Sequence, residues 1–230
     1  MQRMILINSP FFFSEERIKS VSDWAQEFGN DQPLSLEIGC GTGHFIVELA
    51  RRNPQRNYLA IDIFNRGCDK TCRKLHDEGL SNVRVARAEA RQLLSQHLAP
   101  GSLSEIFINC PDPWPKKRHR RRRLVNAEFL SLLRYALRPE GALYFASDVQ
   151  DYARDVAALL DDTTCFERAR ESAVVEELPD YPRSKYMERF LERGEPIYFV
   201  HFRRRPQAAA QVEPPRIQPG FRLHWCAGGP

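Results

Sequence analysis

The chain has 230 residues, of which 42% are hydrophobic, so it can bury one good core as a single domain. Its net charge of +4 is modest, but seven Lys or Arg stand in the eight positions 116–123, and we expect an anionic partner there. No window approaches the roughly 18 consecutive apolar residues of a membrane helix, and six scattered cysteines form no zinc or disulfide pattern. These features predict a soluble, cytoplasmic protein that binds neither membrane nor metal.

Apolar runs with strand character alternate with segments of helical periodicity along the chain. The expected strands are 34–38, 58–63, 83–86, 105–109, 142–146 and 197–202, and the expected helices are 44–52, 67–78, 91–97, 126–137 and 151–160. Such alternation predicts an α/β fold with a parallel sheet. We place an N-terminal extension at 1–27, the main domain at 28–205, and a disordered tail, rich in Pro, Gln, Ala and Gly, at 206–230.

A glycine-rich turn joins the first of these strands to the first helix. Its glycines are Gly39, Gly41 and Gly43, and such a turn lets a ligand approach backbone N–H groups at a helix N-terminus. The dinucleotide-binding fingerprint would need its third glycine at position 44, where this chain has His44. The glycine spacing therefore argues against a dinucleotide-dependent dehydrogenase. A carboxylate at Glu37 would repel an anion and favour a cationic sulfonium or ammonium group.

Two further acidic residues follow the second and third strands. Asp62 lies about 20 residues beyond the glycine loop, where nucleotide-binding folds present a carboxylate to ribose hydroxyls. Glu89 follows the third strand and could meet an adenine edge in the same crevice. Each could instead be a helix N-cap or a first-turn carboxylate, but their common spacing from the glycine loop favours cofactor contacts.

The fourth strand runs directly into a proline-rich loop, Pro111-Asp112-Pro113-Trp114-Pro115. Three prolines in five residues stop the strand and stiffen the loop, which holds Asp112 at the edge of the sheet where α/β folds bind ligands. Trp114 offers a flat face on which a base could stack, although a rigid turn with a buried Trp is the alternative. The adjoining cations favour the nucleic-acid interpretation, because Lys and Arg neutralise backbone phosphates.

With these motifs, the chain resembles the bacterial tRNA (guanine-N7-)-methyltransferase family over roughly residues 28–202. The glycine loop is shared with the wider class I methyltransferases, whereas Pro-Asp-Pro-Trp followed by Lys116, Arg118-His119 and Arg122-Arg123-Leu124 is highly specific. The resemblance implies a Rossmann-like class I fold, with a seven-stranded, mostly parallel sheet and helices on both faces. It also implies S-adenosylmethionine as methyl donor and, as acceptor, N7 of a guanine at position 46 in the tRNA variable loop.

The resemblance further assigns roles to the residues at matching positions. Asp112 would be the catalytic residue, close to the reacting base. The cofactor set would comprise Glu37, Gly39, Gly41, Gly43, Asp62, Glu89 and Asp112. The substrate set would comprise Lys116, Asp148, Ser184, Lys185, Tyr186, Met187 and Glu188.

The sequence departs from the family pattern at Met187, where an acidic residue is usual. A methionine accepts hydrogen bonds weakly, so either Glu188 takes over the role or base recognition is weakened. Met187 therefore leaves open an RNA-binding homologue with weak or no turnover. A class I methyltransferase for another RNA position also stays open, because nothing in the residues themselves selects N7 over another atom. The oligomeric state and the set of accepted tRNAs also stay open.

Overall fold

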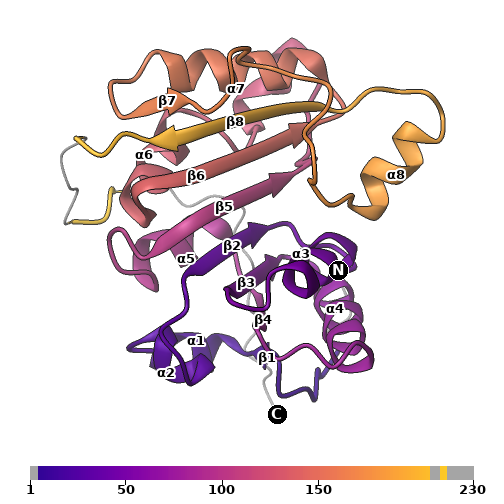
Figure 1. Ribbon diagram of the computed structural model, residues 1–230, viewed down its shortest axis with the longest axis vertical. Helices are drawn as coiled ribbons and strands as arrows, with labels where there is room; N and C mark the ends of the chain where they lie inside the picture. The colour runs from indigo at the N-terminus through magenta and orange to yellow at the C-terminus, as the bar shows by residue number, and fades with distance from the viewer. Residues whose placement is uncertain (1–4, 208–212, 217–230) are drawn as a thin grey trace.

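The computed structural model of the chain describes residues 5–207 and 213–216. These residues form an eight-stranded sheet in the order β1-β4-β3-β2-β5-β6-β8-β7, which runs through the centre of the molecule (Figure 1). Strands β1 to β6 pair in parallel, whereas β8 runs antiparallel to both β6 and β7. The strands are β1 (Phe12–Phe13), β2 (Leu34–Ile38), β3 (Asn57–Asp62), β4 (Val83–Arg87), β5 (Leu103–Asn109), β6 (Leu137–Ser147), β7 (Phe166–Arg168) and β8 (Tyr198–Arg204).

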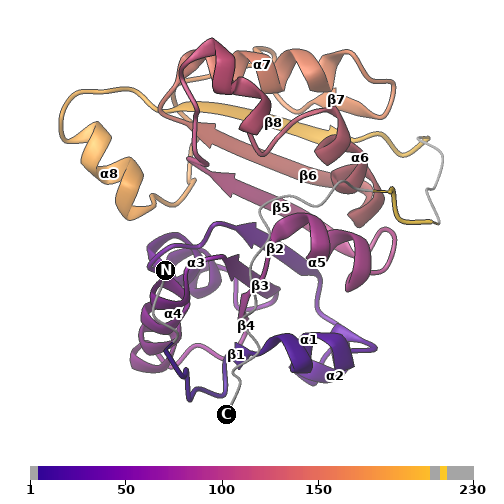
Figure 2. The same cartoon turned by 180° about the vertical axis from the view of Figure 1, so that it is seen from behind.

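Helices cover both faces of the sheet, as Figures 1 and 2 show from opposite sides. Helices α3 and α4 pack on β3, β4 and β5 from one face, and α1, α2, α5, α6 and α7 form the larger core on the other. Within the described ranges the helices are α1 (Glu15–Ser20), α2 (Trp24–Phe28), α3 (His44–Arg52), α4 (Asn65–Asp77), α5 (Ala90–Gln96), α6 (Ala127–Ala136), α7 (Gln150–Asp161) and α8 (Lys185–Leu191), and a 3-10 helix, η1, spans Lys117–Arg122.

Strand β2 illustrates how the sequence sets these two layers. Leu36 and Ile38 belong to the larger core, so Glu37 between them points to the opposite face, because successive side chains alternate across a strand. Parallel strands that are covered on both faces normally consist of apolar residues. A buried glutamate in the middle of the sheet is therefore an exception that calls for a physical reason.

The fold class expected from the sequence is confirmed, but the sheet differs from the expected strands at β1 and β6, and it also contains β7, which was not expected. The sheet has eight strands rather than seven, because Phe12–Phe13 adds a short edge strand beside β4, where Val85 N donates to Phe11 O (2.8 Å). Strand β6 begins at Leu137 instead of residue 142, and residues 138–141 bulge out of its pairing with β5. Neither a two-residue strand nor a bulge leaves a periodic pattern long enough to recognise.

The segment ahead of β2 packs against the larger core. The rings of Phe13 and Trp24 lie 5.6 Å apart, and the indole Nε1 of Trp24 donates to His97 O (3.3 Å). The boundary between an extension at 1–27 and a main domain at 28–205 stays a prediction. Most of the expected tail, 208–212 and 217–230, lies outside the described residues.

Candidate active site

The order in which the chain adds strands to the sheet changes side between β2 and β5. From β2 the chain adds β3 and β4 on one side, and it then crosses to add β5 and β6 on the other. In α/β folds, ligands bind at the carboxyl ends of the strands at such a switch point. Glu37 near the end of β2, Asn109 at the end of β5, and the glycine loop all lie at this edge.

The glycine loop makes a tight turn here. Gly39, Gly41 and Gly43 have φ values of +84°, +54° and +80°, which residues with side chains rarely adopt. Gly39 N donates to Ile61 O (2.8 Å), which ties the loop to β3. Helix α4 contacts the loop at Gly67, where a Cβ would lie 2.5 Å from Gly41 O. This position therefore also requires glycine. The loop pattern alone gave no signal for Gly67.

Asp62 and Glu89 each bond to the backbone of the segment that follows them. Asp62 accepts from Gly41 N (2.7 Å) and from the N–H two residues further on (2.8 Å), and burial raises its pKa. Glu89 is the N-cap of α5 and accepts from Gln92 N (3.1 Å) and from the Arg91 guanidinium (3.0 Å). Glu89 is therefore a helix N-cap, which was its structural alternative, whereas Asp62 precedes the N-cap of α4 and fastens the glycine loop to β3.

Glu37 is almost fully enclosed, with 1% of its surface exposed. Its Oε1 accepts a long hydrogen bond from Asn109 Nδ2 (3.4 Å), and its Oε2 has no hydrogen-bond partner among the described residues. Burial raises the pKa of Glu37 to about 8, against the lowering effect of the Asn109 bond, and the charge of Asp62 raises it further. Because an unpartnered buried carboxylate is unfavourable by itself, this position suits a cationic or hydrogen-bond-donating ligand group.

Asn109 and Tyr181 extend this contact away from the loop. The Tyr181 hydroxyl donates to Asn109 Oδ1 (2.7 Å), and its ring lies 5.0 Å from that of Phe45 on α3. Neither Asn109 nor Tyr181 was predicted from the sequence. Asn109 is the last residue of an apolar strand, and Tyr181 lies in the segment between β7 and α8, which shows no helical or strand periodicity.

Backbone strain marks both ends of the proline-rich loop. Cys110 has a φ of 46° and Trp114 a φ of 42°, in a region that is uncommon for residues with a side chain. Asp112 lies exposed between its two flanking prolines. Strained residues persist only where the surrounding structure holds them, and here they present Asp112 at the carboxyl end of β5.

The indole of Trp114 packs within the basic segment. The His119 ring stacks on it at a centroid distance of 5.9 Å and an angle of 13°, and the Arg122 guanidinium lies 4.8 Å from its ring centroid. The ring is therefore already in contact with two side chains of the basic segment. Stacking of a base on Trp114 stays a prediction.

The basic segment, residues 116–123, contains both anchored and exposed cations. Arg123 is 4% exposed, and it donates to Pro113 O (2.9 Å) and to the Asp155 carboxylate (2.5 Å). Arg120 donates to Asp151 (2.8 Å), so two arginines fasten the segment to α7. The exposed cations are Lys116, Lys117, Arg118, Arg121 and Arg122.

Asp148 follows β6 at the same edge. Its Oδ1 is buried and unpartnered within the part of the chain that the structure describes, and its Oδ2 accepts from the Tyr186 hydroxyl (3.5 Å). Burial raises the pKa of Asp148. Burial together with the neighbouring carboxylates of Asp148 and Asp112 also raises the pKa of Tyr186 to about 12. These three predicted residues are therefore brought close together.

Helix α8 carries the rest of the expected substrate set. Ser184 caps this helix, and its Oγ accepts from Met187 N (3.2 Å). The Met187 side chain is 0% exposed and packs against β6 and the segment before β8, so the departure from the family pattern lies in the core. Lys185 and Glu188 are exposed, and the charges of both act on His44 at the start of α3.

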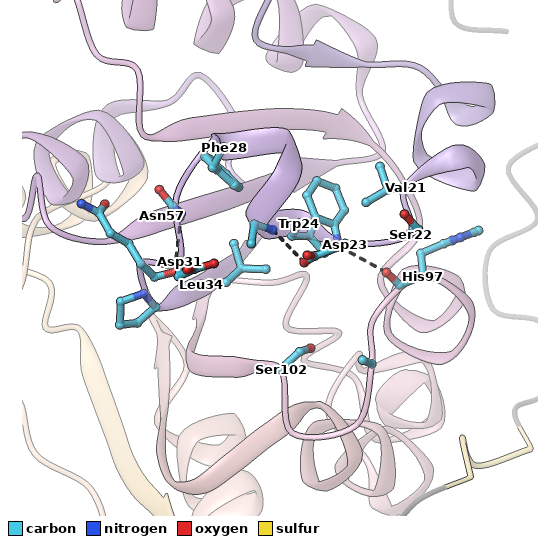
Figure 3. A pocket seen from close by; sticks show the side chains of 14 residues that line it. Val21, Ser22, Asp23, Trp24, Phe28, Asp31, Leu34, Asn57, His97 and Ser102 are labelled. Carbon is cyan, nitrogen blue, oxygen red and sulfur yellow. Dashed lines mark hydrogen bonds between the residues drawn. The ribbon is translucent and has the colours of Figure 1, made fainter.

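A separate pocket lies between α2 and the sheet, as Figure 3 shows. Trp24 and Phe28 line it together with Leu34, Asn57 and Ser102, at or just before the first residues of β2, β3 and β5. A five-residue strand spans about 15 Å, so this pocket is at the opposite edge from the glycine loop. We therefore do not assign the cofactor to it.

Among residues 5–207 and 213–216, no helix is long and apolar enough to cross a membrane. In the same ranges, no three or more His, Cys, Asp or Glu side chains gather where they could hold a metal ion. The cysteines at positions 40, 68, 72, 110 and 165 are free thiols.

Sequence comparison identifies relatives along nearly the whole chain. A family model described as "Putative methyltransferase" matches residues 31–200. A tRNA (guanine-N(7)-)-methyltransferase of Syntrophotalea carbinolica is 52% identical over 98% of this chain and 98% of its own length. A protein of the same name from Geobacter metallireducens is 49% identical over 91% of this chain and 100% of its own length.

Solved structures are similar in fold. The 16S rRNA methyltransferase KamB matches with a TM-score of 0.62 and 18% identity, over 84% of this chain and 95% of its own. An antibiotic-related methyltransferase matches with a TM-score of 0.57 and 21% identity, over 81% of this chain and 96% of its own. At such identities the likeness shows the fold alone, which is the fold of these methyltransferases. From the family match and the two close relatives, the chain belongs to the tRNA (guanine-N(7)-)-methyltransferase family, as its glycine and proline loops predicted.

Proposed function

We propose that this protein transfers a methyl group from S-adenosylmethionine to N7 of a guanine in tRNA, at position 46 of the variable loop. The observation that carries the proposal is the buried Glu37 beside the glycine loop, whose Oε2 lacks a partner in the described ranges. Asp112 and Asp148 lie at the same edge, next to the exposed cations of the basic segment. The names of the close relatives support tRNA guanine N7 as the acceptor.

The residues at the switch point suit S-adenosylmethionine. When bound, it supplies a methyl group on a positively charged sulfonium, which makes that methyl electrophilic. Glu37 would attract the positive charge of the cofactor, and Gly39 and Gly41 leave open space where a side chain would begin. Asp62 and Glu89 would accept hydrogen bonds from ribose and adenine with the lone pairs left over from their backbone bonds.

Asp112 and Asp148 would act on the base. Guanine N7 carries a lone pair and no proton at neutral pH, so the enzyme needs no general base at this atom. Asp112 would position N7 and stabilise the positive charge that develops on the purine. Asp148, together with Tyr186, would accept hydrogen bonds from guanine N1–H and the exocyclic amino group, a donor pair that adenine does not present.

The basic segment would bind the tRNA backbone. Its exposed cations adjoin the loop that carries Asp112, and Lys116 is only four residues from it. Contacts to phosphate fix the register of a nucleic acid and make its affinity depend on salt, whereas contacts to base edges carry the specificity. We therefore assign Lys116 and its exposed neighbours to positioning and Asp148 to base selection.

The test uses labelled S-adenosylmethionine and an unmodified tRNA transcript. After the reaction, borohydride and aniline cleave the RNA at N7-methylguanosine, and we expect label in the tRNA and a single cut at position 46. A transcript with adenosine at position 46 is the matched control and should take up no label. Absence of label in the tRNA would contradict methyltransferase activity on this substrate. Label without scission would show that the methylated atom is not guanine N7, and scission at another nucleotide would show that the methylated guanine is not at position 46.

A further inference from the structure

We infer that Tyr181 is a positioning residue for the cofactor: through Asn109, it orients the carboxylate of Glu37 toward the bound cation. The inference rests on the proposed function, because it assumes that Glu37 holds the positive charge of S-adenosylmethionine. Tyr181 belongs to none of the residue sets that the sequence predicted, and it lies in the segment between β7 and α8.

The hydrogen bonds that link these three residues run in one direction. An ionised Glu37 can only accept, so the amide nitrogen of Asn109 faces it (Nδ2 to Oε1, 3.4 Å). The amide oxygen then faces Tyr181, whose hydroxyl donates to it (2.7 Å). Burial holds the pKa of Tyr181 well above its usual value, so this hydroxyl keeps its proton. Tyr181 therefore prevents the Asn109 amide from turning over, and Glu37 Oε2 stays buried without a partner among the described residues.

The Tyr181 ring is held by aromatic side chains from several elements. Its centroid lies 5.0 Å from Phe45 on α3, 5.8 Å from Tyr144 on β6 and 5.3 Å from Phe199 on β8. Offset and edge-on contacts of this kind restrict where a ring can go. Because the ring is fixed, the hydroxyl has a defined position, and its hydrogen bond fixes the orientation of the Asn109 amide.

Two described groups act on the pKa of Glu37 from neighbouring strands, Asn109 on β5 and Asp62 on β3. Glu37 in turn raises the pKa of Cys40 in the glycine loop and of Tyr181. The Asn109 bond lowers the Glu37 pKa, whereas burial and the charge of Asp62 raise it. If Asn109 is no longer held with its nitrogen toward Glu37, the pKa of Glu37 rises further and the attraction for a cation weakens. The effect of Tyr181 must therefore depend on pH.

The test is calorimetric titration of S-adenosylmethionine into the Tyr181→Phe protein at several pH values, without tRNA. Phenylalanine keeps the ring and removes only the hydroxyl. We expect Kd to rise about five- to tenfold at neutral pH, as for the loss of one buried hydrogen bond. We also expect the pH at which affinity reaches half of its maximum to move upward. Tyr144→Phe removes a hydroxyl from the same aromatic cluster and should keep the wild-type Kd and pH midpoint.

A double-mutant cycle separates positioning from packing. In an Asn109→Ala background, Tyr181→Phe should change Kd little, because the group through which it acts is gone. Wild-type Kd and pH midpoint in Tyr181→Phe would overturn the inference, and so would simple additivity of the two substitutions. If the wild-type protein itself does not bind S-adenosylmethionine, the cofactor assignment fails and the inference falls with it.

Discussion

The guanidinium of Arg123 lies 2.5 Å from the Asp155 carboxylate on α7, although Arg123 belongs to a run of cations that suits RNA. The same side chain donates to Pro113 O (2.9 Å) and covers the ring of Tyr152 at 4.4 Å. Arg123 therefore connects the proline-rich loop to α7 and has no free charge to offer a phosphate. The basic segment therefore contains a buried arginine that holds it to α7 and exposed cations that can contact RNA.

We expect Arg123→Ala to lower the free energy of unfolding by about 2 kcal/mol, because it removes buried hydrogen bonds and a cation–π contact. Urea unfolding at neutral pH measures this change. Arg121→Ala, which truncates an exposed cation of the same segment, is the matched control and should unfold like the wild type. An Arg123→Ala protein of unchanged stability but weaker tRNA binding would contradict the structural role.

The exposed cations should instead control tRNA affinity. We expect the triple variant Lys117→Ala, Arg118→Ala and Arg121→Ala to bind tRNA more weakly and to flatten the slope of log Kd against log salt by about 2, at roughly 0.7 to 0.9 for each phosphate that the variant no longer neutralises. Filter binding across a salt series measures the slope. Lys19→Ala on α1 removes a positive charge outside the segment and should leave the slope unchanged. An unaltered slope in the triple variant would show that the segment does not face phosphates.

The sequence predicted those features that depend on local order along the chain. Parallel strands place their carboxyl ends at one edge, so the positions of Glu37 near the end of β2, Asp112 after β5 and Asp148 after β6 were enough to place all three at that edge. Features that depend on distant partners were not predictable. A run of arginines contains no sign that Arg123 meets Asp155, and an apolar strand gives no reason to connect its last residue, Asn109, with Tyr181, 72 positions away.

Met187 is a second residue whose role follows from its tertiary environment and not from the sequence pattern. Because this side chain is fully buried, we expect Met187→Glu, which restores the acidic residue of the family pattern, to destabilise the protein by about 3 kcal/mol or more. Met187→Leu keeps the apolar volume and should cost less than about 1.5 kcal/mol. Thermal unfolding compares the two. A Met187→Glu protein that melts like the wild type and methylates tRNA faster would show that the acidic residue belongs in the site.

Asp112 should matter for turnover more than for binding. Its carboxylate lies exposed at the edge of the sheet on a strained, proline-bound loop, so its removal should leave the fold intact. We expect Asp112→Ala to slow single-turnover methylation of tRNA by about 100-fold or more, as for loss of one group that stabilises developing charge. Glu177→Ala, at another exposed carboxylate, should keep the wild-type rate. Full turnover in Asp112→Ala would remove Asp112 from the mechanism.

Glu37 should make the stability of the protein depend on pH. Burial raises its pKa from 4.5 to about 8. Between these two values the folded protein holds a proton that the unfolded chain has lost, so stability falls as pH rises, by up to about 1.4 kcal/mol per pH unit. Glutamine carries no charge at any of these pH values. We therefore expect Glu37→Gln to be more stable than the wild type at pH 8 and to bind S-adenosylmethionine more weakly.

Urea unfolding of both proteins near pH 6 and pH 8 isolates this contribution, because the other titrating groups are common to the two. The difference in unfolding free energy between Glu37→Gln and wild type should grow with pH. A difference that stays constant over this range would mean that Glu37 does not titrate there, and the carboxylate would then be ionised without a ligand. A gain in stability coupled to a loss of cofactor affinity would show that the buried charge is retained for binding and not for folding.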